Sequence, residues 1–454
     1  MDINLGKKLL EQKKLREAEN CLIKLLNDGN KSSRLMFLLG FTYFELNQFN
    51  ESIKFYKKAL KVENKNESIM LNLAHAEQTI GNIKTAKNLY LKILKNNDLN
   101  IRAYYGLFTL NPFNLKKNDF QNIQRAIKKN KNKLYENSLA EFLISKNEKN
   151  EQNYKKEMIH LEQYHLNCFK SNESYNQQGL YYYNNIISQI YSKLKFTNDQ
   201  TPNNLKNINP IFIIGLPRSG STLVETMLTS SEDKVYSFGE SSIFNVAFIE
   251  QLNKAIFDKN FSIKNYSPSI DVKKISENIT ENYNKFINLS NNEFNSIVDK
   301  SLENFFNIEV ILKVFPNAKF IHCKRNLYDS VIAIYQAMLP NLPWTHSVSD
   351  IINYVDNYIK TIKYFEKKYQ NNILSVDLKK LSNDKINISK EIFLFCNLNW
   401  SPKILDFYKR HDLNIKTLSN TQLRNKIVKY NDNQYKSYSF ILDSFKNKFN
   451  WIKY

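Results

Sequence analysis

The chain is poor in cysteine and has no long apolar segment. Its 454 residues include four scattered cysteines without metal-ligand spacing: Cys21, Cys168, Cys323 and Cys396. So few cysteines do not suggest a disulfide framework, and we expect them to be reduced and mostly buried. About 18 uninterrupted apolar residues, the minimum for a transmembrane helix, occur nowhere. The segment Met1–Glu11 contains acidic residues and no long apolar core, which argues against a secretory signal. These absences predict a soluble cytoplasmic protein without a membrane partner.

Acidic residues are the minority among the charged ones. Against 65 Lys and Arg there are 44 Asp and Glu, and the formal net charge is +21. Such a charge favours anionic partners such as nucleic acid, acidic peptides or a sulfated nucleotide. The lysines are spread along the chain, however, so most are expected on a solvated surface. The tyrosines of 164–169 and 181–183 are explained more simply by core packing than by base stacking, which makes nucleic acid an unexpected partner.

The amino-terminal part repeats with a period of 34 residues. Small residues recur at Gly6, Gly40 and Ala74 (40 − 6 = 34; 74 − 40 = 34), and the same step relates Ala18, Ser52 and Ala86, and Leu22, Tyr56 and Tyr90. This period resembles the tetratricopeptide repeat, TPR. The resemblance implies stacked helical hairpins, with at least three units over about residues 1–100. Repeats of this kind usually bind protein partners or self-associate. An inert solenoid that stabilises the neighbouring domain is the alternative.

The length of the chain predicts more than one domain. We assign residues 1–110 to the repeats, 111–205 to a helical extension and linker, and 206–454 to a second domain. The segment that organises this second domain begins with the β-branched and aromatic run Ile211–Ile214, which suits a buried parallel strand. Helical spacing follows from Thr222 to Leu228. The loop between them opens onto a helix N-terminus, where free N–H groups and the helix dipole attract an anion.

This loop has the outline of a nucleotide-binding P-loop. Gly215 and Gly220 have the required spacing, but Ser221 occupies the position of the P-loop lysine. The cation lies inside the loop, as Arg218. Hydroxyl and N–H groups for an anion come from Ser219, Gly220, Ser221 and Thr222. The loop resembles the 5′-phosphosulfate loop of sulfotransferases that use 3′-phosphoadenosine 5′-phosphosulfate (PAPS). The resemblance implies an α/β, P-loop-like sulfotransferase domain with a central parallel sheet; an ordinary strand-to-helix turn is the alternative.

Two later segments supply candidate catalytic groups. Gly239-Glu240 resembles the Gly-Glu pair of protein-tyrosine sulfotransferases, which implies that Glu240 is the catalytic base. A base is needed because the reference pKa of tyrosine is about 10. Asp299-Lys300-Ser301 resembles the lysine segment of the same enzymes, and Lys300 would stabilise charge on the bridging oxygen. The alternatives are an exposed loop carboxylate and a surface lysine. The short apolar run before Asp299 makes an NTPase strand end unconvincing.

Arg325 follows a predicted strand, at the end where open α/β sheets place ligands. It resembles the arginine of the sulfotransferase 3′-phosphate motif, which is followed eight residues later by a serine. Here the eighth residue is Ala333, and the usual Asp-Pro pair is replaced by Asn326-Leu327. Ser330, one helical turn before Ala333, could partly substitute. These departures predict a weakened nucleotide affinity.

Toward the end of the chain, residues 372–377 are predicted to form another strand. Leu378 stands near a position where the family often has a nucleotide-contacting tyrosine. The segment Thr417–Arg424 resembles the family's late adenosine loop. On that resemblance, Ser419 lies near the transferring group and Arg424 near a phosphate.

The two resemblances, over about 1–110 and 208–440, are together typical of a TPR-sulfotransferase. They imply sulfuryl transfer from PAPS to a hydroxyl of a protein, peptide or small compound, with protein tyrosine as one candidate. Glu240 would deprotonate the acceptor while Arg218, Lys300 and Ser419 stabilise the transition state, and these residues demand no metal. Two alternatives stay open. One is a P-loop kinase or NTPase, disfavoured by Ser221. The other is a TPR scaffold with a catalytically degenerate transferase domain.

Overall fold

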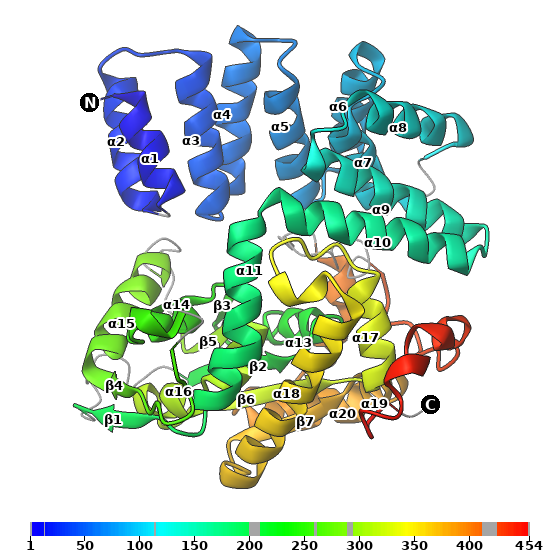
Figure 1. Ribbon diagram of the computed structural model, residues 1–454. Coiled ribbons are helices and arrows are strands. Elements are labelled where there is room, and N and C mark those ends of the chain that lie inside the picture. Colours follow the sequence, from blue (N-terminus) through cyan, green and yellow to red (C-terminus); the bar gives the residue numbers. More distant parts are fainter. Residues whose placement is uncertain are drawn as a thin grey trace. The chain divides into compact units, whose positions relative to one another are not determined.

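The protein is described by a computed structural model, shown in Figure 1. It describes residues 2–12, 14–112, 115–198, 209–257, 261–287, 294–410 and 425–452. The chain divides into two compact units. The first is Met1–Tyr164, and the second comprises His165–Tyr408 and Asn425–Tyr454. The boundaries expected from the sequence, near residues 110 and 205, stay predictions.

The first unit is built from helices that follow one another in antiparallel pairs (Figure 1). They are α1 (Ile3–Glu11), α2 (Leu15–Asn27), α3 (Ser33–Glu45), α4 (Phe49–Val62), α5 (Glu67–Thr79), α6 (Ile83–Asn96), α7 (Ile101–Leu110), α8 (Lys117–Lys129) and α9 (Leu134–Asn150). Helix α10 (Tyr154–Ser171) follows. The predicted helical hairpin repeats are confirmed.

The 34-residue period reflects close contacts between helices. A Cβ atom on Gly40 would lie 2.6 Å from Cδ1 of Tyr56, and one on Gly6 would lie 2.5 Å from Cδ2 of Leu22. The Ser52 hydroxyl donates to the carbonyl of Gly40 over 2.7 Å. Side chains larger than hydrogen at positions 6 and 40 would push the paired helices apart, so the repeated small residues are a packing requirement.

The helix starts repeat with the same period. Ser32, Asn66 and Asn100 are the N-cap residues of α3, α5 and α7, and each side chain accepts a hydrogen bond from the backbone N–H three residues later. They are 34 residues apart (66 − 32 = 34; 100 − 66 = 34). An oxygen-bearing side chain at this position satisfies a backbone N–H that lacks a partner within the helix. Each repeat therefore fixes the start of its first helix by the same local interaction.

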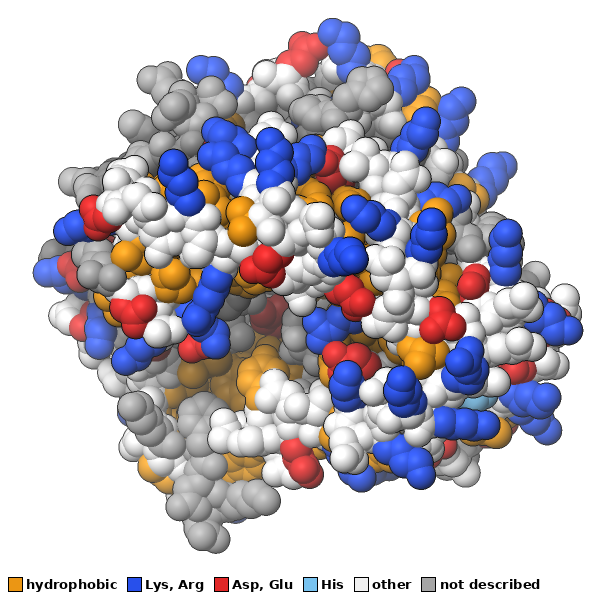
Figure 2. Space-filling view, turned by 90° about the horizontal axis from the view of Figure 1, so that it is seen from above, with side chains coloured by type: hydrophobic (Ala, Val, Ile, Leu, Met, Phe, Trp, Pro, Cys, Tyr) orange, Lys and Arg blue, Asp and Glu red, His pale blue; other side chains and the backbone are white. Residues whose placement is uncertain are grey.

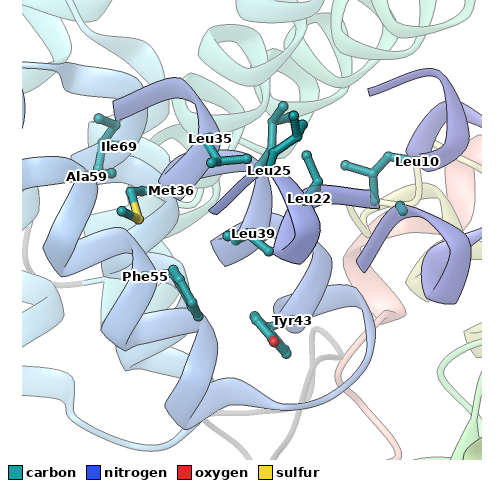
Figure 3. Packing of buried hydrophobic residues seen from close by; sticks show 12 residues of the cluster. Leu10, Leu22, Leu25, Leu35, Met36, Leu39, Tyr43, Phe55, Ala59 and Ile69 are labelled. Carbon is teal, nitrogen blue, oxygen red and sulfur yellow. The ribbon is translucent and has the colours of Figure 1, made fainter. Parts of the chain in front are cut away.

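The core of the first repeats consists of aliphatic and aromatic side chains from α1 to α5, as Figure 3 shows. Leu22, Leu35, Leu39 and Ala59 have no measurable exposure to solvent. No single hairpin could bury this surface alone, so stacking of consecutive repeats creates the core.

The second unit combines helices with parallel strands (Figure 1). Before the main sheet lie α11 (Glu173–Tyr181), a π-helix (Tyr182–Ile187), α12 (Ser188–Ile190) and β1 (Lys195–Thr197). The next elements are β2 (Asn209–Gly215), α13 (Ser221–Leu228), β3 (Val235–Gly239), α14 (Ile243–Ile249), β4 (Ser269–Asp271), α15 (Val272–Ile287), β5 (Ser296–Asp299), α16 (Ile308–Val314), β6 (Lys319–Lys324), α17 (Leu327–Tyr335), α18 (Val348–Lys368), β7 (Ile373–Asp377), α19 (Leu378–Asn383) and α20 (Lys385–Phe395). Short 3₁₀ helices occupy Lys254–Phe257, Leu302–Phe306, Pro343–Thr345, Pro402–Lys409, Lys436–Ile441 and Asp443–Phe445.

Within the described residues, five strands form one parallel sheet in the order β3-β5-β2-β6-β7. Strands β1 and β4 form a separate parallel pair. The main chain leaves β2, runs to one side through β3 and β5, and then crosses to β6 and β7 on the other side. The strand order therefore reverses at β2. In open α/β sheets, ligands bind beyond the carboxyl ends of the strands at such a reversal.

Several features predicted from the sequence are confirmed. Strand β2 is parallel to both neighbours, and Ile211 to Ile214 are fully buried. The four cysteines are buried and free. Among the described residues no helix combines the length and apolarity needed to cross a membrane. Figure 2 shows Lys and Arg side chains distributed over most of the visible face, with Asp and Glu side chains among them, as expected for a solvated surface.

Candidate active site

The loop between β2 and α13 is shaped by residues with positive φ angles. Gly215 has φ 142°, Arg218 has φ 67° and Gly220 has φ 89°. A Cβ atom on Gly215 would lie 2.3 Å from the carbonyl oxygen of Cys323, and one on Gly220 would lie 2.6 Å from Cδ1 of Leu378. Both glycines are thus required by conformation and by close approach. The turn delivers the chain directly into the N-terminus of α13.

Polar groups of the loop either stabilise the turn or line the helix start. The Ser219 hydroxyl donates to the carbonyl of Leu216 over 2.7 Å and is buried. Ser221 and Thr222 form the first turn of α13, whose N-cap is Gly220. The backbone N–H groups of a first helical turn have no partner within the helix, and the helix dipole favours an anion there. The loop therefore has the local chemistry of a sulfate- or phosphate-binding turn.

Arg218 and Arg325 are brought together at this loop. Nη1 of Arg325, which follows β6, donates to the backbone carbonyl of Arg218 over 3.3 Å. Burial lowers the pKa of the Arg218 guanidinium; the phenol of Tyr435 opposes this, and the charge of Arg325 adds to it. Two cations placed this close in a largely buried region repel each other, so the arrangement favours an anion between or beside them.

Arg325 is held from the other side by the carboxy-terminal segment. Its Nε donates to the hydroxyl of Tyr430 over 2.9 Å, and that hydroxyl in turn donates to Oδ2 of Asp329. The rings of Tyr430 and Tyr435 each have their centroid 5.1 Å from the guanidinium carbon of Arg325, within cation–π range. Nη2 of Arg325 lies 3.8 Å from the Asp329 carboxylate. These contacts use Nε and one N–H of Nη1, which leaves further guanidinium donors for a phosphate.

The second cluster consists of Lys300 and two glutamates. Nζ of Lys300 lies 3.1 Å from Oε2 of Glu225 and 3.0 Å from Oε1 of Glu240. It also donates to Oγ1 of Thr222 over 3.4 Å. Burial, the largest influence, lowers the pKa of Lys300, but the two carboxylates together outweigh it and the pKa is raised. Since Thr222 belongs to the first turn of α13, this cluster adjoins the anion loop.

A β-bulge aims Glu240 at this cluster. The register between β3 and β5 shifts between Ser237 and Gly239, and Gly239 has φ 61°. The N–H of Lys300 donates to the carbonyl of Gly239 over 2.9 Å. Bulges re-aim side chains and are frequent beside active sites. The bulge thus explains why a glycine precedes Glu240.

Asp299 has a structural environment. Its Oδ2 accepts from the hydroxyls of Ser241 and Tyr283, and its Oδ1 accepts from the N–H of Ser301 and the amide of Asn304. Burial raises the pKa of Asp299, although these hydrogen bonds oppose the shift. Because both oxygens are engaged, Asp299 ties the end of β5 to its surroundings. It is not presented to a ligand.

Ser330 is engaged within its own helix. Its hydroxyl donates to the carbonyl of Asn326 over 2.8 Å, and 1% of the residue is exposed. Ala333 is also buried on α17. Ser419 and Arg424 lie outside the described residues. The structure therefore brings together Arg218, Arg325, Thr222, Glu240 and Lys300, whereas Ser330 is turned to its own backbone.

Glu225, Asp329, Tyr430 and Tyr435 were not identified from the sequence. Glu225 could have been found, because three residues separate it from Thr222 and such residues share a helix face. Tyr430 and Tyr435 lie more than a hundred residues from Arg325, and no local pattern connects them.

Fold and site define the second unit as an α/β domain whose anion-type loop and cationic pair lie at the strand-order reversal of a parallel sheet. Residues 210–402 match the sulfotransferase family, and residues 33–66 match the tetratricopeptide repeat. The chain thus carries amino-terminal TPR repeats and a sulfotransferase family domain.

Individual relatives are more distant. A protein of Aquifex aeolicus (strain VF5), known only as an uncharacterized protein, is 28% identical over 235 residues; the match spans 50% of this chain and 30% of that protein. The sulfotransferase domain from the Synechococcus PCC 7002 olefin synthase aligns at 18% identity and TM-score 0.35, covering 52% of this chain and 90% of that one. Sulfotransferase STF9 from Mycobacterium avium aligns at 11% identity and TM-score 0.30, covering 54% and 77%. Because these TM-scores are low, the assignment depends on the family match.

Proposed function

We propose that the protein transfers the sulfuryl group of PAPS to an acceptor hydroxyl. The observation that carries the proposal is one edge of the sheet that holds both a pair of arginines and a lysine–carboxylate cluster. Arg325 Nη1 reaches the Arg218 carbonyl, and Lys300 reaches both Glu240 and the first turn of α13. The sulfotransferase family match over 210–402 supports the same reading.

The residues present fit a nucleotide with two anionic ends. The loop at Arg218 and the first turn of α13 would hold the phosphosulfate, as helix N-termini hold phosphates. Arg325, whose remaining N–H groups point away from Tyr430, would bind the 3′-phosphate. The losses at Ala333 and Leu378 remove possible contacts, so we expect the affinity to be modest.

The transfer itself needs a base and charge stabilisation. The acceptor oxygen forms a bond to sulfur while the bond from sulfur to the phosphate oxygen breaks, and the acceptor proton passes to Glu240. Glu240 suits this task because its side chain is 59% exposed and can reach an entering hydroxyl. Lys300 and Arg218 would stabilise the negative charge that develops on the leaving oxygen. Protein tyrosine is one candidate acceptor, and the TPR repeats are candidates for binding the protein that carries it or a second copy of the chain.

Glu240→Gln tests this assignment. We expect sulfuryl transfer to fall by roughly 10²–10⁴-fold, the usual contribution of a general base. The dissociation constant for 3′-phosphoadenosine 5′-phosphate should stay within about twofold, because Glu240 contacts Lys300 and not the arginine pair. Glu232→Gln is a matched control, since Glu232 is an exposed glutamate paired with Lys403 on the same unit. A full transfer rate in Glu240→Gln would exclude Glu240 as the base.

A second candidate function is a TPR scaffold whose transferase domain has lost catalysis. It is favoured by the Ser330 hydroxyl, which is engaged with Asn326, and by Leu378, which packs against Gly220 where the family often has a tyrosine. Calorimetry with 3′-phosphoadenosine 5′-phosphate separates the two. Undetectable binding at high protein concentration would favour the scaffold, whereas binding plus transfer from labelled donor to a panel of hydroxyl compounds and peptides would favour the enzyme.

The kinase or NTPase alternative has less support. Ser221 occupies the position of the P-loop lysine, and both oxygens of Asp299 accept hydrogen bonds from protein groups. Magnesium-dependent ATP turnover by the purified chain would nevertheless revive it.

A further inference from the structure

Lys300 is shared by two carboxylates in different surroundings. Its side chain has 0% exposure, compared with 14% for Glu225 and 59% for Glu240. A buried ammonium ion is very costly unless nearby protein groups neutralise and hydrogen-bond it. The more buried carboxylate is better placed to do this permanently, because solvent competes less for it.

Glu225 is also fixed by a chain of hydrogen bonds. Its Oε1 accepts from the hydroxyl of Ser237 over 2.6 Å, and that hydroxyl accepts from the N–H of Gly239 over 3.0 Å. One oxygen of Glu225 therefore faces the β-bulge while the other faces Lys300. Glu240 follows the same bulge but projects into solvent. One carboxylate is anchored, and the other can move.

We propose that Glu225 is the positioning residue of the site: it keeps Lys300 charged and in place when Glu240 turns from Lys300 to the proton of the acceptor hydroxyl. The inference rests on the proposed function. Without Glu225, the ammonium group would have Glu240 as its counterion, and Glu240 would have to stay paired with it. The two roles of counterion and base are divided between two glutamates.

The electrostatics of the cluster agree with this division. The groups facing Lys300 are Glu225 from α13, Glu240 after β3 and Cys323 from β6. Burial raises the pKa of the Cys323 thiol to about 12, so this group is neutral. Among the influences that raise the pKa of Lys300, Glu225 is the largest. Its removal lets burial dominate, and Lys300 would then lose its proton at a lower pH.

The first test is the pH dependence of transfer in Glu225→Gln. We expect kcat to fall about tenfold or more and the alkaline limb of the pH–rate profile to move down by roughly 1–3 units, the shift produced by removing a close opposite charge. Affinity for 3′-phosphoadenosine 5′-phosphate should change less than about twofold. Glu225→Asp keeps the charge and should restore much of the limb. Glu366→Gln is the matched control, because Glu366 is a hydrogen-bonded carboxylate of the same unit that contacts His322 and Ser375 instead.

The second test does not need activity. By linkage, a Lys300 whose folded pKa lies below its unfolded value makes stability rise with pH between those values. Urea unfolding from pH 7 to 10 should therefore show the gap between the wild type and Glu225→Gln closing by up to about tenfold in the unfolding equilibrium constant per pH unit. A purely structural loss would leave a constant gap, as in Glu366→Gln.

The outcomes separate the two proposals. If the wild type does not transfer sulfate, the proposed function fails and the unfolding test still decides the electrostatic role. A folded Glu225→Gln with an unchanged alkaline limb and a pH-independent gap overturns the inference while leaving the function intact. If Glu225→Gln does not fold, Ser237→Ala replaces it. This variant releases one oxygen of Glu225 and should shift the limb in the same direction by less; no shift would likewise overturn the inference.

Discussion

Replacement of Arg325 tests whether the second arginine recognises a 3′-phosphate. The variant Arg325→Ala removes a guanidinium whose side chain is 8% exposed and whose Nη1 also supports the Arg218 carbonyl. It should therefore weaken every nucleotide somewhat, because the loop loses a support. The specific part of the loss should appear only with ligands that carry a 3′-phosphate.

The magnitude follows from the surroundings of Arg325. Two unit charges 4 Å apart interact by about 4 kcal/mol at an effective dielectric constant of about 20. Part of this is lost, because Asp329 lies 3.8 Å from Nη2 and competes for the same charge. Hydrogen bonds to charged groups contribute about 1.5–3 kcal/mol net. We expect about 2–3 kcal/mol, or roughly a 30- to 160-fold loss of affinity.

The assay is calorimetry with two nucleotides, 3′-phosphoadenosine 5′-phosphate and AMP. The ratio of their dissociation constants cancels any general damage to the loop, so this ratio should change by the predicted factor. Lys324→Ala is the control, because Lys324 is the exposed neighbour and its removal changes the net charge equally. Equal losses for both nucleotides would show that Arg325 does not contact the 3′-phosphate and would refute the reasoning.

Two further predictions concern the fold around the site. Gly220→Ala should cost about 1–2 kcal/mol of stability, the price of a left-handed backbone in a residue with a Cβ atom, and should weaken nucleotide binding as Leu378 shifts. Gly29→Ala has the same strain at φ 92° but open space around it, so a thermal-unfolding and calorimetry comparison that finds equal effects on nucleotide binding would contradict this. The hydrogen bond from His322, partly opposed by burial, lowers the pKa of Glu366 to about 2. The stability from this carboxylate is thus present above pH 4.5 and lost as the pH falls toward 2. In urea unfolding, Glu366→Gln should flatten that dependence, and an unchanged acid slope would exclude Glu366 as its source.

Local patterns were sufficient to predict much of the fold. The run Ile211–Ile214 between Pro210 and Gly215 predicted β2, because a short β-branched run without polar alternation suits a strand buried on both faces. The 34-residue period predicted the repeats, because the packing of Gly40 against Tyr56 recurs in each hairpin. In both cases, the determining interactions involve residues close together in the sequence.

The site could be predicted only in part. Arg218 and Arg325 were identifiable, because each follows a strand and both strand ends must meet at one edge of a parallel sheet. The contact between Arg325 and Tyr430 could not be predicted, since it joins segments with no shared pattern. Glu225 was missed for another reason. A glutamate in a helix is usually solvated, and its burial becomes apparent only when Lys300 and Ser237 surround it.

The central position of β2 has a consequence for how the protein is made. This strand leaves the ribosome before the strands that flank it, and Gly215 precedes Arg325 by 110 residues (325 − 215 = 110). At about 5–20 residues per second, the nascent loop waits roughly 5–20 seconds for the arginine that supports it. A nascent chain arrested before β6 would expose the apolar edge of β2, so this interval is when chaperones or a premature stop would matter most.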